Sequence, residues 1–202
     1  MTIRVGIDVG GTKIAAIAFD ARGRSTSELR RPTPRNDYQA TIRTIVDIVP
    51  AARAEANRAG LRNRAETAFT VGIGIPGSIA RTTGTVQNAN STWLNERPLL
   101  ADLTDAIGQT VRIENDANCF ALSEANDGVA SDASTVFGVI LGTGCGGGLV
   151  INRQLRDGPR GIAGEWGHIP LPAPDDDERP GPRCWCGRDG CIETWISGPG
   201  LE

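Results

Sequence analysis

The chain has 202 residues, with 21 basic and 24 acidic side chains and a formal net charge of -3 at pH 7. These charges form no long runs, so the chain lacks the electrostatic pattern typical of nucleic-acid-binding proteins. The N-terminal segment MTIRVGIDVGG contains no apolar stretch of the length that a signal peptide or a membrane span requires. We therefore expect a cytoplasmic protein that binds small, neutral or phosphorylated ligands, with no nucleic-acid or membrane partner.

The apolar residues follow strand and helix periodicities in alternation. The expected elements, in chain order, are strands at 3–9 and 14–19 joined by a Gly-rich turn, a helix at 42–57, a buried strand that runs into a glycine turn at 69–77, a helix at 99–107, a strand at 111–116, a helix at 117–126, and a second Gly-linked strand pair at 135–144 and 146–152. Pro50 lies inside the first helical pattern, where we expect a kink or a break. Strands alternating with helices predict an α/β fold.

The first strand ends in a glycine loop with the composition of a phosphate site. Asp8 stands at the strand end and is followed by Gly10, Gly11, Thr12 and Lys13. Glycines let backbone N–H groups approach phosphate oxygens, the hydroxyl can donate to them, and the carboxylate can hold a metal ion or its water. A Gly-Gly hairpin turn followed by Thr-Lys also occurs for purely structural reasons. The spacing is not that of a P-loop.

A second loop of the same kind joins the later strand pair. Its residues are Gly142, Thr143, Gly144, Cys145 and Gly146, followed by two further glycines. Two strand-loop-strand segments form a weak internal repeat in pattern but not in identity. A nucleotide phosphate chain bound from both sides would need two such loops. The presence of both loops therefore favours a phosphate-binding role over two unrelated turns.

These loops are accompanied by further motifs that identify a family resemblance. The motifs are GIDVGGTK at 6–13, GIGIPGSI at 72–79, NANSTWLN at 88–95, ENDANCFALSEA at 114–125, GTGCGGG at 142–148, GEWGH at 164–168 and CWCGRDGCIETWISG at 184–198. Together they resemble the ROK sugar kinases and repressors, which belong to the superfamily of hexokinase and actin. The resemblance covers the whole chain.

The resemblance implies a two-lobed actin-like ATPase (ribonuclease H-like) fold and ATP-dependent phosphorylation of a sugar 6-hydroxyl, with ATP and Mg²⁺ at the glycine loops. We expect an N-terminal lobe at 1–114 and the start of a second lobe at 115–202. IPGSI with NANSTWLN looks most like the bacterial fructokinases, so fructose is the expected substrate. A kinase of N-acetylglucosamine, another amino sugar or glucose is the alternative. Members of this family are often dimers, so a homodimer is a possible assembly of this chain.

Asp116 is the expected catalytic base. It lies between a predicted strand and the following helix, where a carboxylate can align a sugar hydroxyl and accept its proton. From spacing alone, Asp116 could equally be only the N-cap of the helix at 117–126. The resemblance implies the catalytic role. It also implies that the sugar hydroxyls are bound by Asn90, Asn115, Glu165, His168 and Glu193.

Three cysteines and the one histidine of the chain predict a metal site. His168, Cys184, Cys186 and Cys191 supply one imidazole and three thiolates, which is a complete tetrahedral set for structural Zn²⁺. The competing interpretation is a disulfide, but Cys184 and Cys186 would form a strained ring and the third cysteine would stay unpaired. We expect the metal to order the loop at 156–195. Cys119 and Cys145 are interpreted as small buried residues.

A sugar-responsive transcriptional repressor is the rival interpretation from another functional class. Such repressors carry a helix-turn-helix ahead of the first glycine loop, and seven residues precede Asp8 here. We also expect members of this family to continue beyond the point that matches Glu202. This chain of 202 residues is thus expected to hold an incomplete nucleotide site and to have little or no activity alone.

Overall fold

The computed structural model describes residues 2–61 and 68–202, which divide into two compact units. Unit 1 comprises Met1–Asp116 and unit 2 comprises Ala117–Glu202. Among the described residues, no helix combines the length and the apolar character needed to cross a membrane.

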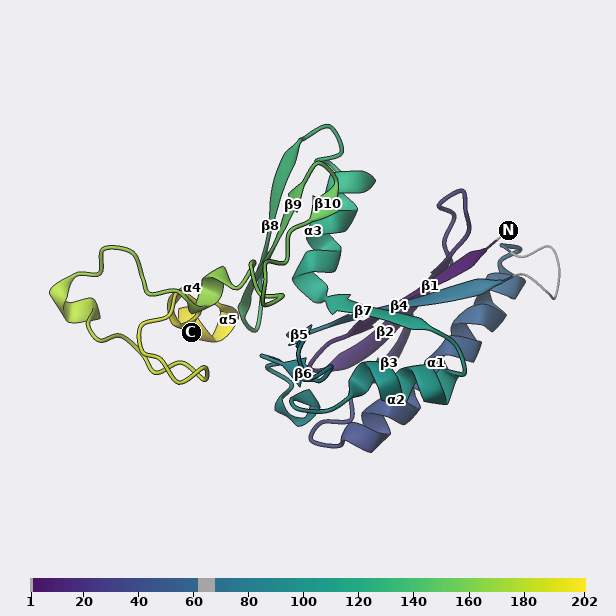
Figure 1. Cartoon of the computed structure of the whole chain (residues 1–202), viewed down its shortest axis with the longest axis horizontal. Coiled ribbons are helices and arrows are strands. Elements are labelled where there is room, and N and C mark those ends of the chain that lie inside the picture. Colours follow the sequence, from purple (N-terminus) through teal and green to yellow (C-terminus); the bar gives the residue numbers. More distant parts are fainter. Residues whose placement is uncertain (1, 62–67) are drawn as a thin grey trace. The chain divides into compact units, whose positions relative to one another are not determined.

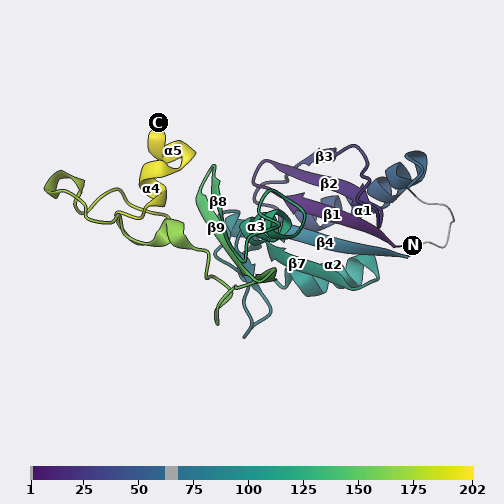
Figure 2. The same cartoon turned by 90° about the horizontal axis from the view of Figure 1, so that it is seen from above.

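Unit 1 is built on a five-stranded sheet with the strand order β3-β2-β1-β4-β7 (Figure 2). Its strands are β1 (Ile3–Val9), β2 (Lys13–Phe19), β3 (Leu29–Pro32), β4 (Phe69–Ile75) and β7 (Val111–Asn115). β1 pairs antiparallel with β2 and parallel with β4, and β4 pairs parallel with β7. The carboxyl ends of β1, β4 and β7 therefore meet at one edge of the sheet, where ligands of open α/β sheets bind.

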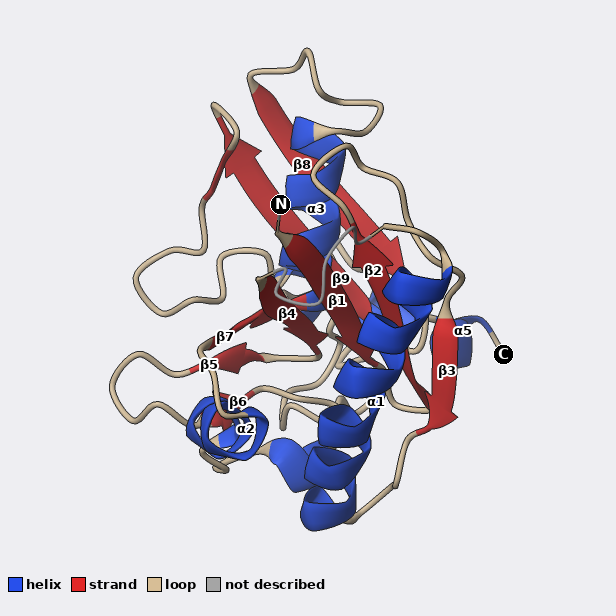
Figure 3. Ribbon diagram, turned by 90° about the vertical axis from the view of Figure 1, so that its right-hand side faces the viewer, coloured by secondary structure: helices blue, strands red, loops and turns tan. Residues whose placement is uncertain are grey.

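Two helices cover this sheet. α1 (Tyr38–Arg58) packs against β1, β2 and β3, and α2 (Leu99–Ile107) packs against β7 and α1 (Figure 3). The side chain of Asp37 accepts a hydrogen bond from the Ala40 N–H and caps the first turn of α1. The short strands β5 (Ser78–Ile79) and β6 (Val86–Gln87) and the 3₁₀ helix η1 (Thr92–Leu94) complete unit 1.

Of the kink or break expected at Pro50, the break does not occur, because α1 is continuous across this residue. Proline inside a helix removes one intrahelical hydrogen bond, and its ring crowds the carbonyl four residues earlier. Ile45, Ile48, Val49 and Ala52 lie on either side of it and are all buried in the main hydrophobic core. Burial of this apolar face offsets the cost of the proline and holds both halves of the helix on the sheet.

Unit 2 contains an antiparallel sheet with the order β10-β9-β8 and a helix beside it (Figure 1). The elements are α3 (Asp116–Asn126), whose first residue belongs to unit 1, with β8 (Thr135–Leu141), β9 (Cys145–Ile151) and β10 (Gln154–Leu155). Glycines bring α3 close to the strands: a Cβ at Gly138 or at Gly148 would lie 2.8 Å from the Cβ of Ala121.

The chain after β10 has little regular structure. It contains the 3₁₀ helices η2 (Trp166–His168) and η3 (Asp176–Glu178) and the short helices α4 (Glu193–Ile196) and α5 (Gly198–Leu201). Isolated bridges pair Pro170 with Cys191 and Arg183 with Asp189. Few apolar side chains are buried in this segment, so its order must come from other interactions.

Three further expectations need correction. The strand expected at 135–144 ends at Leu141, because the glycines that follow form the loop, and the strand expected at 111–116 ends at Asn115. Cys119 is exposed, because α3 buries the face that carries Ala117, Asn118 and Ala121. β3, β5, β6 and β10 were not expected from the sequence.

Candidate functional site

The first glycine loop connects β1 to β2 and is supported by the segment that follows β3. The Gly10 N–H donates to the Lys13 carbonyl at 2.9 Å, which closes the turn. The carbonyl of Gly10 accepts from Thr33 Oγ1 at 2.7 Å, and the carbonyl of Thr12 accepts from the Thr33 N–H at 3.0 Å. Arg35 Nε donates to the Gly11 carbonyl at 3.2 Å. The loop carbonyls are thus engaged within unit 1.

The charged groups of this loop lie at its two ends. Lys13 Nζ is 3.9 Å from Glu28 Oε1, and both side chains are largely exposed, so this ion pair adds little stability. Partial desolvation raises the pKa of the Asp8 carboxyl, while Lys13 lowers it and Glu28 raises it further. Within the described part of the chain, the N–H groups of Gly11 and Thr12 have no acceptor. The loop can therefore offer backbone donors to an anion.

The turn after β4 positions Asn115, the last residue of β7. The Asn115 side-chain amide donates to the Gly77 carbonyl at 3.0 Å. Gly77 has φ +77°, and a Cβ there would lie 2.3 Å from the Gln87 carbonyl oxygen, so only glycine fits. The IPG sequence therefore has a structural reason within unit 1, namely a tight turn that anchors Asn115 next to Asp116.

The NANSTWLN segment forms a braced loop beside the first glycine loop. Asn95 binds the backbone of Ala89 twice, because its Oδ1 accepts from the Ala89 N–H and its Nδ2 donates to the Ala89 carbonyl, each at 2.9 Å. Ser91 is buried, and its Oγ lies 3.9 Å from the position of a Cβ at Gly11. Asn90 is exposed between them. Sequence reasoning missed Asn95, although it belongs to the motif.

Asp116 is the first residue of α3 and directly follows β7. The helix begins one residue earlier than expected, so Asp116 lies within the first turn rather than at the N-cap. A carboxylate at a helix N-terminus is favoured by the helix dipole. The side chain thus stands at the carboxyl edge of the sheet of unit 1, next to the anchored Asn115.

The second glycine loop connects β8 to β9 and is supported by residues far along the chain. The Gly142 N–H donates to the Gly144 carbonyl at 3.0 Å, and the Gly198 N–H donates to the Gly142 carbonyl at 2.7 Å. Trp166 Nε1 donates to the Gly146 carbonyl at 2.8 Å. Thr143 is exposed at the tip of the loop.

The residues of the GEWGH motif pack against this loop. A Cβ at Gly167 would lie 2.4 Å from the Cys145 carbonyl oxygen, and one at Gly164 would lie 1.7 Å from the Gly147 carbonyl oxygen. The two glycines therefore allow backbone-to-backbone contact between the η2 segment and β9. Glu165 and His168 lie within the same short segment, one on either side of Gly167.

The four predicted metal ligands come together within unit 2. Their ligand atoms, from His168, Cys184, Cys186 and Cys191, all lie within 4.8 Å of one another. His168 Nδ1 is 3.6 Å from Cys184 Sγ, and Cys186 Sγ is 3.6 Å from Cys191 Sγ. Tetrahedral zinc with bonds of about 2.0–2.3 Å places neighbouring ligand atoms roughly 3.5–3.8 Å apart. The donor set and these two separations suit such an ion, and all five cysteines are free of disulfides.

The three thiols differ in their electrostatic surroundings. Burial raises the pKa of Cys191 to about 12, and hydrogen bonds with Cys186 and Cys184 act in the same direction. Burial also raises the pKa of Cys184. At Cys186, burial raises the pKa, but hydrogen bonds from the backbone and side chain of Arg188, together with those of Cys184 and Cys191, outweigh it and the pKa is lowered. Arg188 therefore favours a thiolate at the most accessible sulfur of the cluster.

Within each unit, the structure brings several predicted site residues together. In unit 1, Asn115 and Asp116 lie side by side, and the first glycine loop lies near Ser91. In unit 2, the carboxylate of Glu193 reaches the second loop, because its Oε2 accepts from the Cys145 N–H at 2.9 Å. The supporting roles of Thr33 and Trp166 were not anticipated.

Relatives with assigned names match nearly all of this chain. An N-acetyl-D-glucosamine kinase from Pectobacterium atrosepticum is 44% identical over 201 residues, which is 98% of this chain and 63% of that protein. The chain thus spans less than two thirds of the length of this relative.

Solved structures show the same fold. A ROK family glucokinase from Streptomyces griseus, in complex with glucose and AMPPNP, is 35% identical with a TM-score of 0.76, covering 98% of this chain and 58% of that chain. A ROK family transcriptional regulator, homologous to the Escherichia coli MLC protein, has a TM-score of 0.77 at 21% identity, covering 98% of this chain and 48% of that chain, a likeness that shows the fold alone. The predicted α/β, actin-like fold class is confirmed. Since the ROK family model matches residues 4–202, this chain belongs to the ROK family.

Proposed function

We propose that the protein is an ATP-dependent sugar kinase. The observation that carries this proposal is the placement of Asp116 at the start of α3, next to Asn115, in the same unit as a glycine loop with backbone donors. The similarity to proteins named as sugar kinases supports the same activity.

We propose an amino sugar, N-acetylglucosamine, as the substrate rather than fructose. The fructose expectation rested on IPGSI and NANSTWLN. In the structure, Gly77 of the first motif allows a tight turn, and Asn95 of the second hydrogen-bonds the backbone of Ala89. Neither role depends on the identity of the sugar. The relative at 44% identity is named as an N-acetyl-D-glucosamine kinase, which favours the alternative.

In this proposal, Asp116 accepts the proton of the sugar hydroxyl while that oxygen bonds to the γ-phosphorus and the bond to the ADP oxygen breaks. Asn90 and Asn115 in unit 1, and Glu165, His168 and Glu193 in unit 2, are proposed to bind sugar hydroxyls. The phosphates are proposed to meet the two loops, Asp8 to Lys13 and Gly142 to Gly146. When bound, Mg²⁺ would neutralise phosphate charge, and Asp8 is the residue proposed to hold it or its water.

We further propose that His168, Cys184, Cys186 and Cys191 hold structural Zn²⁺. Four ligands fill a tetrahedral ion, so no position is left for a reactive water. Because His168 Nδ1 is the ring nitrogen that faces Cys184, the opposite nitrogen remains for a sugar hydroxyl.

Replacement of the proposed base tests the mechanism. In the full-length protein, Asp116→Asn keeps the side-chain size but cannot accept the proton, so kcat should fall by about 10²–10⁴-fold with a small change in sugar KM. Asp127→Asn, just beyond the other end of α3, is the matched control and should leave kcat unchanged. A kcat of Asp116→Asn equal to that of Asp127→Asn would refute Asp116 as the base.

A further inference from the structure

The carboxylate of Glu193 connects two segments of unit 2 that are far apart in sequence. Its Oε2 accepts from the Cys145 N–H at 2.9 Å, and its Oε1 accepts from Trp185 Nε1 at 2.6 Å. Glu193 is only 8% exposed. Hydrogen bonds to a buried carboxylate are stronger than those between neutral groups, so both contacts restrain their donors.

The first donor belongs to the second glycine loop. Cys145 is the residue with which the loop ends and β9 begins, and its N–H points to Glu193. A Cβ at Gly144 would lie 2.7 Å from Glu193 Oε2, so the carboxylate fills the space directly beneath the loop. The conformation of residues 142–145 therefore depends on where this carboxylate stands.

The second donor belongs to the cysteine turn, residues 184–191. Trp185 lies between Cys184 and Cys186, and its ring meets His168 edge-on, with centroids 4.9 Å apart and planes at 83°. Trp185 is 52% exposed, so apolar burial does little to hold it in place. Its orientation must come from the turn that carries it, from the contact with His168 and from the bond to Glu193.

We propose that Glu193 is a positioning residue that ties the second glycine loop to the cysteine turn, so that order in the turn sets the geometry of the loop. The consequence for anion binding rests on the proposed function, because that function makes the loop a phosphate site. A carboxylate has further lone pairs, so this role leaves capacity for a sugar hydroxyl. The proposal concerns how the loop is held and can be tested without turnover.

Amide hydrogen exchange of Cys145, followed by NMR in the zinc-loaded protein, reports on this connection. Glu193→Gln keeps the shape of the side chain but weakens acceptance, so exchange at Cys145 should accelerate about tenfold. Trp185→Phe removes the indole N–H and should accelerate it about threefold. Removal of the metal with a chelator should accelerate it at least as much as Trp185→Phe.

Two controls separate positioning from general destabilisation. Trp195→Phe removes an indole whose Nε1 is buried without a partner among the described residues, so it should leave Cys145 unchanged. The Gly10 amide, bonded to Lys13 at 2.9 Å in the first loop, should exchange at the same rate in every sample.

The proposal is wrong if Cys145 exchanges at the parental rate in Glu193→Gln or after metal removal. It is also wrong if Gly10 accelerates together with Cys145, since that reports global unfolding. A titration with the ATP analogue AMPPNP in the full-length protein separates the two proposals. Acceleration at Cys145 with no nucleotide binding in the parent would uphold the positioning role and overturn the kinase function.

Discussion

The two glycine loops share a sequence pattern but are stabilised in different ways. The first is supported from Thr33 and Arg35, which directly follow the adjacent strand of the same sheet. The second is supported from Trp166, Glu193 and Gly198, which lie in or beyond a segment with little regular structure. A strand-glycine-strand pattern can therefore be held by its own sheet or by a remote element that needs its own source of order.

The two sheets also differ in how well their first strands are covered. β1 has β2 on one side and β4 on the other, and its alternate side chains are buried. Its counterpart β8 has only β9 as a neighbour in the described sheet, and Phe137, Val139 and Leu141 are exposed. Unit 1 thus has a large hydrophobic core around its sheet, whereas unit 2 has a smaller apolar cluster that contains Ala121, Ala125 and Val150.

The largest expected effect is loss of the proposed metal. Cys191→Ser should abolish zinc binding, which supplies on the order of 10–16 kcal/mol in small zinc-dependent peptides. Residues 156–195 should then become sensitive to protease while unit 1 remains resistant. Metal content and limited proteolysis would check this, with the exposed Cys119→Ser as the control. An unchanged zinc content of about one per chain in Cys191→Ser would contradict the assigned ligand set.

An intermediate effect is expected from alanine in each loop. At Gly144 a Cβ would lie 2.7 Å from Glu193 Oε2, whereas at Gly11 the nearest atom, Ser91 Oγ, is 3.9 Å away. Gly144→Ala should therefore lower the free energy of unfolding by about 1–3 kcal/mol, and Gly11→Ala by less than about 1 kcal/mol. Denaturant titration of both variants measures the difference. Equal destabilisation would remove the proposed contrast between the loops.

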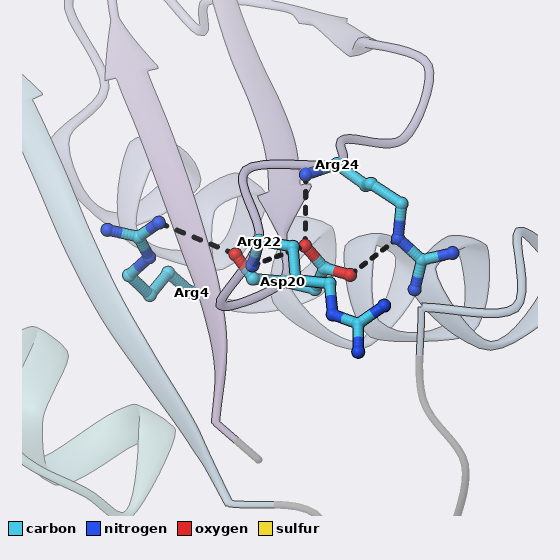
Figure 4. Close-up of polar contacts among 4 residues, drawn as sticks. All are labelled: Arg4, Asp20, Arg22 and Arg24. Atoms are coloured by element: carbon cyan, nitrogen blue, oxygen red, sulfur yellow. Dashed lines mark hydrogen bonds and ion pairs between the residues drawn. The ribbon is translucent and has the colours of Figure 1, made fainter. Parts of the chain in front are cut away.

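The smallest expected effect concerns the turn after β2, which is braced by a buried carboxylate. Asp20 accepts hydrogen bonds from the backbone N–H groups of Arg22 and Arg24, each at 2.9 Å, and from Arg24 Nε at 2.7 Å, while its own carbonyl accepts from Arg4 (Figure 4). Burial raises the pKa of this carboxyl, but the hydrogen bonds from Arg24 and Arg22 outweigh it and the pKa is lowered.

Because its pKa is lowered in the folded state, ionised Asp20 stabilises the fold at neutral pH. This stabilisation is lost as the pH falls through the folded-state pKa. The melting temperature of Asp20→Asn should therefore lie below that of the parent at pH 7, and the gap should close below about pH 4. The exposed Asp47→Asn is the control. A gap that widens on acidification would contradict this. In unit 2, the turn between β9 and β10 corresponds to this turn between β2 and β3. It is formed by Asn152 and Arg153, at φ +52° and +62°, and contains no such carboxylate.

Much of the fold could be predicted from local pattern. The alternation in β1 and β2 and the helical spacing in α1 and α2 are properties of short windows, and the structure confirms those elements. β5, β6 and β10 have two residues each, too few to show a period. The continuity of α1 through Pro50 depended on burial, which the helical pattern did not reveal.

The proximity of the four metal ligands followed from residue type and spacing, because few residues suit a thiolate site and they are rare in this chain. The partners of Glu193 could not be predicted. Cys145 is 48 residues away and contributes a backbone N–H, which leaves no signal in the identity of the residue. Asn95 could have been considered, because asparagine side chains often hydrogen-bond the backbone in turns and loops.

The central proposal is that the protein transfers phosphate from ATP to an amino sugar. Its most direct test is a coupled assay of ADP release by the full-length protein with N-acetylglucosamine, fructose, glucose and mannose. We predict that kcat/KM is highest for N-acetylglucosamine. A higher kcat/KM for fructose would contradict the substrate, and no sugar-dependent ADP release with any of the four would contradict the kinase activity itself.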